Sequence, residues 1–217
     1  MIAGILLDPK VLEQNPVPHV RVYASSPLKR GIDLLLAIPG LAVLALVFIP
    51  VAITIKFSSR GPIFFRQMRL GLDGRSFQLV KFRTMRNPVN GEAWGERTAQ
   101  HDPRVTAVGS MLRKSYLDEL PQFWNVIRGS MSVVGPRPEI PVLARSIAAR
   151  HPRFAHRLVV KPGITGLAQI YYRHADTGKD AWRRYYYDAF YMRQCSAGLD
   201  ARIAMRTVIR MIRYRGQ

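Results

Sequence analysis

One apolar segment restricts the fold of this chain more than any other feature. Residues 34–55 carry no charged side chain and only one hydroxyl group, that of Thr54. A straight α-helix of this length spans roughly 33 Å, and the hydrocarbon core of a bilayer is about 30 Å thick. The sequence therefore predicts a helix inserted in a membrane. The apolar run is too long and starts too late for a cleavable signal peptide.

Basic residues flank this segment on both sides, namely Lys29, Arg30, Lys56 and Arg60. Because cations favour the cytoplasmic side of a membrane, both ends of the segment favour the same face. Pro39 and Pro50 interrupt the run, and proline removes a backbone donor and kinks a helix. Two topologies stay open: a re-entrant helix that enters one leaflet and returns, or an ordinary signal-anchor helix.

The net charge of the chain points to a polyanionic partner. The 217 residues include 33 Lys and Arg against 14 Asp and Glu, which gives a formal charge of +19. Nucleic acid, an anionic membrane face and a nucleotide-diphosphate substrate all fit this charge. Cys195 is the single cysteine, which excludes a disulfide framework and a cysteine-based metal site and fits a reducing compartment. The length fits one globular domain with an appendage.

The rest of the chain predicts a compact α/β fold of the α+β kind that is mostly helical. We expect strands at 62–67 and 76–82 around a turn at 71–74, a loop at 87–100, helices at 105–115, 119–127, 141–150, 181–193 and 199–213, an extended piece at 130–135 and a turn at 162–166. The last helix carries Arg202, Arg206, Arg210 and Arg213 beside Ile203, Val208, Ile209 and Ile212. This pattern is typical of an amphipathic helix at a membrane interface.

The acidic pair Asp118 and Glu119 is the strongest candidate for chemistry. It is the one place where two acidic residues adjoin, and basic residues surround it, namely Arg113, Lys114, Arg128 and Arg137. Cations bind phosphoryl oxygens, and carboxylates bind Mg²⁺ or attack phosphorus. The alternative is structural, because Asp118 suits the N-cap of the helix expected after it, where the helix terminus would keep it ionised.

Three further features have both a functional and a structural interpretation. Alternation places Lys81 and Arg83 on one face of a strand end, as an anion site or as a solvated edge. Residues 135–138 form a rigid turn that presents Arg137 to an anion or simply reverses the chain. Residues 185–187 and 190–191 are aromatic and suit base stacking, a membrane interface or core packing. A phosphate-binding loop, a dinucleotide fingerprint and an Asp-x-Asp motif are all missing from the sequence.

The order of the motifs resembles that of one known family. In sequence, the motifs are GPIFFRQ at 61–67, KFRTM at 81–85, Arg113 five residues before LDELPQ at 117–122, NVIRGSMS at 125–132, VGPRPE at 134–139 and KPGITG at 161–166. Together they resemble the bacterial sugar transferases, which are monotopic phosphoglycosyl transferases that act on polyprenyl phosphates. The resemblance covers about residues 27–213, and we expect the minimal catalytic form of the family.

The resemblance implies an activity and a site. Members transfer a sugar 1-phosphate from a UDP-sugar to undecaprenyl phosphate, release UMP and require Mg²⁺, as the first membrane step of exopolysaccharide, O-antigen or glycoconjugate synthesis. By resemblance, Asp118 is the nucleophile that forms a covalent phosphosugar intermediate, Glu119 assists, and both carboxylates hold the metal. The phosphate contacts of the family correspond to Lys81, Arg113 and Arg137. We add Arg83 and Gln169 as candidate phosphate and substrate contacts, the latter near a candidate sugar-facing loop at 173–179.

The resemblance also favours the re-entrant topology. It implies an N-terminal arm at 1–26, a re-entrant helix at 27–60 and a catalytic domain at 61–217 on the cytoplasmic face of a bacterial inner membrane. The family breaks its helix at Ser-Pro, but Ala45 and Leu46 stand there in this chain, so we assign the break to Pro39 and Pro50. No nucleic acid partner is then expected. A UDP-releasing glycosyltransferase and a non-enzymatic basic protein that binds membrane or nucleic acid remain as alternatives, and the donor sugar stays open.

Overall fold

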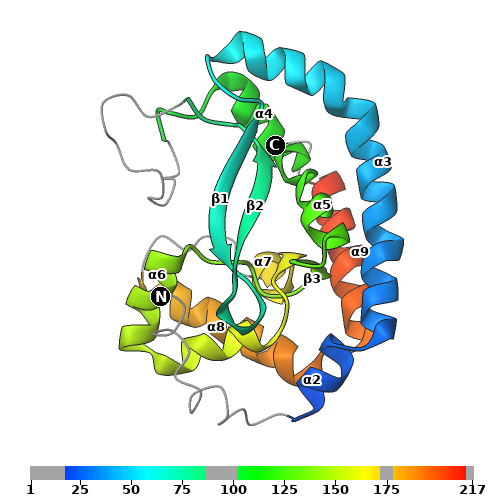
Figure 1. The fold of residues 1–217 in the computed structure, drawn as a ribbon, viewed down its shortest axis with the longest axis vertical. Coiled ribbons are helices and arrows are strands. Elements are labelled where there is room, and N and C mark those ends of the chain that lie inside the picture. Colours follow the sequence, from blue (N-terminus) through cyan, green and yellow to red (C-terminus); the bar gives the residue numbers. More distant parts are fainter. Residues whose placement is uncertain (1–17, 87–101, 172–177, 214–217) are drawn as a thin grey trace.

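The computed structural model describes residues 18–86, 102–171 and 178–213, and these residues are mostly helical (Figure 1). The elements are α2 (Pro18–Ala24), α3 (Pro27–Ser58), β1 (Phe64–Leu70), η2 (Leu72–Gly74), β2 (Ser76–Phe82), α4 (Ala107–Lys114), η3 (Leu117–Glu119), α5 (Gln122–Ile127), β3 (Ser132–Val134), α6 (Pro141–Arg150), η4 (Pro152–Val159), β4 (Gly163–Thr165), α7 (Leu167–Tyr171), α8 (Gly178–Gln194) and α9 (Ala197–Arg213), where η marks a 3-10 helix. Most of the expected arm, the loop at 87–100 and most of 173–179 lie outside the described residues.

The apolar segment forms one continuous helix, α3, through both prolines that were expected to break it. Ser26 caps its first turn by accepting a hydrogen bond from the Lys29 backbone N–H, and Pro27 stands where a missing donor costs nothing. Figure 1 shows α3 bending around one side of the molecule. Proline in a helix interior bends the axis without ending the helix, so Pro39 and Pro50 shape α3 but do not terminate it.

Both halves of α3 pack against the same body. Ala37, in the first half, lies in a buried core with residues of α5, β3 and α9, and Ile55, in the second half, lies in another core with Phe82 of β2. Between them, a Cβ on Gly40 would come within 2.4 Å of the Phe123 ring, so α5 approaches the backbone of α3 closely. The two ends of the helix are therefore attached to one globular unit.

The outward side of α3 is apolar and exposed. Leu46 is 80% exposed and Phe57 is 89% exposed, and only 17% of the most apolar stretch of the helix is buried. Among the described residues, α3 is the one helix long and apolar enough to cross a membrane by length and composition. An exposed apolar surface of this extent indicates an environment other than water.

The predicted hairpin is confirmed, but the first strand, expected at 62–67, begins two residues later and ends three residues later. β1 and β2 pair antiparallel with Phe64 opposite Phe82, and the register continues to Leu70 opposite Ser76. Asp73 and Gly74 both adopt positive φ, at 52° and 70°, in the turn between the strands. These residue types tolerate the left-handed conformation that a tight hairpin needs.

The turn expected at 162–166 was a wrong prediction, because this segment contains strand β4. β4 pairs parallel with β3, with Ser132 opposite Gly163 and Val134 opposite Thr165. The backbones come so close that a Cβ on Gly163 would meet the nitrogen of Gly135 at 2.1 Å. Such a short parallel pairing depends on a distant partner, which local turn chemistry does not reveal.

The helix predicted at 119–127 is two elements, and Asp118 caps neither. Tyr116 takes a left-handed conformation at φ 58° and ends α4, after which Asp118 lies inside the 3-10 turn η3. Helix α5 starts later, behind Pro121, which provides no side-chain cap. The N-cap interpretation of Asp118 is therefore wrong, and no helix terminus of α5 holds its charge.

The aromatic helix and the last helix are more deeply packed than their sequences indicate. Tyr185 and Tyr191 of α8 are buried, which favours the core interpretation of these rings. In α9, Ile203 is buried instead of exposed, and Arg210 donates to the Gln169 and Ile170 carbonyls at the end of α7. Arg202, Arg206, Val208 and Ile209 are exposed, and the side chains of Ile212 and Arg213 lie outside the described residues.

Candidate active site

Two cations from distant parts of the chain bind the same oxygen of Glu119. Lys81 at the end of β2 donates from Nζ to Glu119 Oε1 at 2.9 Å, and Arg137 donates from Nη2 to the same atom at 2.8 Å. Burial alone would raise the pKa of Glu119, but attraction by Arg137 and Lys81 outweighs it and holds the pKa well below its usual range. Glu119 is therefore a permanently charged anchor for both cations.

Asp118, next to Glu119, differs from it because no cation in the described part of the chain binds its carboxylate directly. Its side chain lies in η3 and the residue is 8% exposed, and no described residue forms a hydrogen bond or ion pair with its carboxylate. Burial raises the pKa of Asp118 to about 6, the charge of Glu119 acts in the same direction, and Lys81, Arg113 and Arg137 oppose them. The carboxylate is thus still mostly ionised at neutral pH, poorly solvated and free to bond to a ligand.

Arg113 supplies a third cation on the Asp118 side. It lies in the last turn of α4, and its Nε donates to Thr84 Oγ1 at 2.9 Å. Thr84 directly contacts α4, because a Cβ on Gly109 would come within 1.9 Å of the Thr84 carbonyl oxygen. The five residues Lys81, Arg113, Asp118, Glu119 and Arg137, here called the reaction cluster, therefore come from β2, α4, η3 and the loop after β3.

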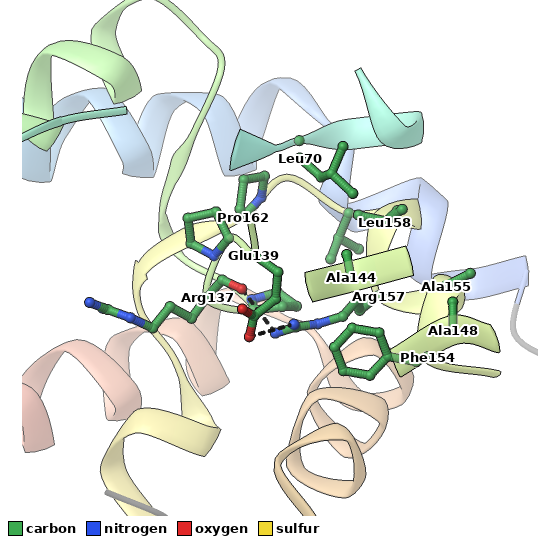
Figure 2. A pocket seen from close by; sticks show the side chains of 14 residues that line it. Leu70, Arg137, Glu139, Ala144, Ala148, Phe154, Ala155, Arg157, Leu158 and Pro162 are labelled. Atoms are coloured by element: carbon green, nitrogen blue, oxygen red, sulfur yellow. Dashed lines mark hydrogen bonds and ion pairs between the residues drawn. The ribbon is translucent and has the colours of Figure 1, made fainter. Parts of the chain in front are cut away.

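Arg137 extends from a loop whose backbone carbonyls are all bound. The carbonyls of residues 136–139 accept, in order, from the Gly163 N–H, Arg157 Nη2, Arg69 Nη1 and the Leu70 N–H, at 2.9, 2.9, 3.0 and 3.0 Å. Two of the four residues are prolines without a donor of their own, so the loop is fixed through its acceptors. In Figure 2 the Arg137 side chain points away from Glu139, while Glu139 and Arg157 face each other.

A buried ion network supports this loop from behind. Glu139 Oε1 lies 3.3 Å from Arg157 Nη1 and 3.1 Å from Arg184 Nη2, and Arg157 Nη2 lies 2.7 Å from Asp188 Oδ2. The pKa of Glu139 is lowered because these cations outweigh the effect of burial. The apolar pocket drawn in Figure 2 lies behind the loop and is lined by Leu70, Ala144, Phe154 and Leu158 among others.

Arg69 is a residue near the cluster that our sequence analysis missed. Arg69 is half-buried, and this burial together with the nearby charge of Arg137 lowers its pKa to about 10. The hairpin register places Arg69 and Lys81 on the same face, because Phe65 lies opposite Lys81 and the period along a strand is two residues. Extending the first strand by three residues in the sequence would have found it.

The structure does not bring Arg83 or Gln169 into the reaction cluster. Arg83 is directed at the last carbonyls of α3, and its Nη2 donates to the Ser59 carbonyl at 2.7 Å. Gln169 lies on α7, where its side-chain amide donates to the Ile164 carbonyl at 3.4 Å. The remaining candidates, Lys81, Arg113 and Arg137, surround the acidic pair.

The acidic pair fits a metal ion that takes most of its ligands from a phosphate-containing substrate and from water. No group of three or more His, Cys, Asp or Glu side chains that could hold an ion occurs among the described residues. Mg²⁺ usually takes only one or two protein carboxylates and completes its octahedron with phosphate oxygens and water. Asp118 and Glu119 would be the protein ligands of such a metal, since the Asp118 carboxylate and the second oxygen of Glu119 have no hydrogen-bond partner among the described residues.

Comparison with known proteins gives a consistent result. Residues 24–214 match the family described as bacterial sugar transferase. The chain is 39% identical over 213 residues to the UDP-glucose:undecaprenyl-phosphate glucose-1-phosphate transferase of Escherichia coli (strain K12), which covers 94% of this chain and 46% of the relative. It is 38% identical over 182 residues to the UDP-N-acetylgalactosamine-undecaprenyl-phosphate N-acetylgalactosaminephosphotransferase of Aeromonas hydrophila, covering 83% of this chain and 43% of the relative.

Relatives of different length share this region. A UDP-glucose:undecaprenyl-phosphate glucose-1-phosphate transferase of Caulobacter vibrioides is 39% identical over 196 residues, covering 89% of this chain and 72% of the relative. The chain spans less than half the length of the two relatives from Escherichia coli and Aeromonas hydrophila. The match to the family nevertheless covers most of the sequence, from the last residue of α2 to the end of α9. The chain therefore belongs to the bacterial sugar transferase family.

Proposed function

We propose that this protein transfers a sugar 1-phosphate from a UDP-sugar to undecaprenyl phosphate and releases UMP. The names of relatives at 38–40% identity support this class of donor and acceptor. The observation that carries the mechanism is the difference within the acidic pair: Glu119 is bound by two cations, and no described side chain binds Asp118. A buried carboxylate left open beside three cations suits a nucleophile that attacks a phosphoryl group.

In the first proposed step, an Asp118 carboxylate oxygen forms a bond to the phosphorus that carries the sugar. The bond from this phosphorus to the bridging oxygen breaks, and the oxygen leaves with its electron pair on UMP. Lys81, Arg113 and Arg137 balance the negative charge of the diphosphate, so that an anionic carboxylate can approach it. Because both cations on Glu119 are already oriented, little reorganisation accompanies the reaction.

In the second proposed step, a phosphate oxygen of undecaprenyl phosphate attacks the same phosphorus. The bond to Asp118 breaks, the carboxylate is regenerated, and the product is undecaprenyl diphosphate sugar. A covalent intermediate lets a soluble donor and a lipid acceptor use one site in turn. Bound Mg²⁺ would supply further charge neutralisation at the diphosphate, with Asp118 and Glu119 as its protein ligands.

We further propose that α3 is re-entrant and that the body lies on the cytoplasmic face of the bacterial inner membrane. Both halves of α3 pack on one body, and basic residues flank both of its ends. Single cysteines at Leu28 and Ser58, in a Cys195→Ser background, test this with a membrane-impermeant maleimide on inverted and right-side-out vesicles. Labelling of both positions only in inverted vesicles is expected, and labelling from opposite faces would mean a spanning helix.

The function is tested by nucleotide release from purified protein in a membrane mimetic with Mg²⁺, undecaprenyl phosphate and a panel of UDP-sugars. We expect UMP to appear with one of the UDP-sugars for the wild-type protein and not for Asp118→Asn. UDP in place of UMP would indicate a conventional glycosyltransferase. Asp118→Asn should trap no sugar phosphate on the protein, and the wild type without lipid acceptor should show a mass increase of one sugar phosphate.

A further inference from the structure

Arg83 binds carbonyl groups at and just beyond the C-terminal end of α3. Its Nη1 donates to the Arg60 carbonyl at 2.9 Å, and its Nη2 donates to the carbonyls of Ser59 at 2.7 Å and Ile55 at 3.3 Å. Arg83 is only 3% exposed, and Ile55 is completely buried. Both terminal nitrogens of the guanidinium are thus bound to the end of α3 and to the chain that leaves it, while the buried Nε has no hydrogen-bond partner among the described residues.

The Ile55 carbonyl already accepts from the Ser59 N–H and the Ser58 hydroxyl, so the carbonyls that depend on Arg83 are those of Ser59 and Arg60, directly after the helix. The last turn of any α-helix leaves carbonyl groups without an intrahelical partner, and at the end of an apolar helix in lipid water is a scarce substitute. A guanidinium offers several donors in a fixed plane, and its positive charge suits the C-terminal end of a helix. Arg83, the residue directly after β2, therefore supplies donors to the end of α3 and the chain beyond it.

The residues beside Arg83 reach the reaction cluster. Lys81 binds Glu119, and Thr84 accepts the hydrogen bond that holds Arg113. Phe82, between them, stacks on Phe64 with ring centroids 5.5 Å apart and lies in the same core as Ile55 of α3. Four consecutive residues thus connect the end of the membrane helix to two cations of the site.

We propose that Arg83 is a positioning residue that couples the seating of the C-terminal end of α3 to the placement of Lys81 and Arg113. The proposal rests on the proposed function, because its main readout is turnover. Arg83 touches no reacting group and acts through its neighbours in the 81–84 segment. When α3 is seated in lipid, Arg83 fixes the end of β2, and the cations meet the diphosphate in the reactive geometry.

The first test measures UMP release by Arg83→Gln and Arg83→Lys in vesicles. For Arg83→Gln, kcat should fall about 10- to 100-fold, the loss expected from a misplacement of about 1 Å, while KM for the UDP-sugar changes less than about threefold. Arg83→Lys should recover part of kcat, because an ammonium still donates to carbonyls. Arg86→Gln is the matched control, since it removes the same charge from an exposed position three residues along the chain, and it should keep wild-type kcat.

A double-mutant cycle with Lys81→Met separates positioning from loss of fold. If Arg83 acts through Lys81, the loss in kcat of the double variant should be smaller than the product of the single losses by about fivefold or more. Independent losses, or a kcat per folded enzyme that stays at the wild-type value in Arg83→Gln, would overturn the proposal. If Arg83→Gln does not fold, Arg83→Lys decides by the same cycle.

A second readout needs no turnover. In a Cys195→Ser background, maleimide labelling of Ser58→Cys in vesicles should become severalfold faster with Arg83→Gln, because the end of α3 loses its attachment. It should be unchanged with Asp118→Asn or Arg86→Gln. An unchanged labelling rate with Arg83→Gln contradicts the proposal. A wild-type enzyme that releases no UMP but shows the labelling effect would reject the proposed function and leave the attachment of α3 by Arg83 intact.

Discussion

Two buried clusters of charged side chains in this protein differ in whether every charged group forms a hydrogen bond or an ion pair. The first, here called the base network, joins the start of α3 to α2, α8 and α9 through Lys29, Asp33, Asp200, Tyr23 and Tyr191. Lys29 Nζ lies 3.2 Å from Asp33 Oδ1 and 2.7 Å from Asp200 Oδ2. Asp33 also accepts from the Ser132 hydroxyl, so each charge in this network is bound.

The second group, the reaction cluster, is incomplete in one position. Glu119 is bound by two cations, but no described side chain binds the Asp118 carboxylate. A buried charge without a partner is costly, and proteins retain such groups mainly at functional sites. Burial and charge alone therefore do not mark a site, whereas a buried charge without a partner, beside charges that have partners, does.

The largest effect on turnover should come from Asp118→Asn, which separates a catalytic role of a buried charge from a structural role. We expect UMP release to fall about 10³-fold or more, because the nucleophile is removed. The free energy of unfolding should stay equal or rise, since the substitution removes a poorly solvated carboxylate. Turnover and chemical denaturation of the same preparation check this, and a large loss of stability would mean that Asp118 is a structural residue.

Lys29→Met should give the opposite result in the base network. Removal of the one ammonium leaves Asp33 and Asp200 buried without their cation, so we expect a loss of about 3–5 kcal/mol in the free energy of unfolding. Activity per folded molecule should change little. The measurement is denaturant unfolding in detergent, with Arg75→Gln at an exposed position as control. A stable but inactive Lys29→Met protein would contradict the assignment of the base network to stability and of the reaction cluster to catalysis.

A smaller effect should appear in how the free energy of unfolding depends on pH when divalent metal is removed, because Asp118 titrates. The pKa of Asp118 in the folded protein is raised to about 6 by burial, above the ordinary value of 3.8. Its contribution to stability is therefore fully present below pH ~4 and is lost as pH rises towards 6, by up to about 3 kcal/mol. Unfolding in EDTA between pH 4 and 7 should show this decline in the wild type, and Asp118→Asn should lack it.

Local patterns in the sequence were sufficient for some elements. The hairpin followed from alternating residues around Asp73 and Gly74, and α6 followed from the helical pattern that begins at Pro141. The cations Lys81, Arg113 and Arg137 were identified through motifs, and the structure gathers them around the acidic pair. These features depend on residues that are close in sequence or belong to a recurrent pattern.

Other features depend on contacts that no local pattern encodes. The left-handed Tyr116 separates α4 from η3, although tyrosine has no preference for this conformation, so Asp118 was mistaken for a helix cap. β4 forms only because β3 lies beside it. Alternation along a strand would place Arg83 on the same face as Lys81, but β2 ends at Phe82. The Arg83 side chain therefore leaves this face and donates to the Ser59 carbonyl, directly after α3.

The attachment of Arg83 to α3 has a consequence for the order in which the chain matures during synthesis. Arg83 follows Ser58 in the sequence, so α3 leaves the ribosome before the side chain that binds its last carbonyls. The same order holds at the other end, where Arg30 of α3 is made before the Val126 and Ile127 carbonyls of α5 to which it donates. Helix α3 is thus made early, and both of its ends are fixed only when later segments of the chain fold against it.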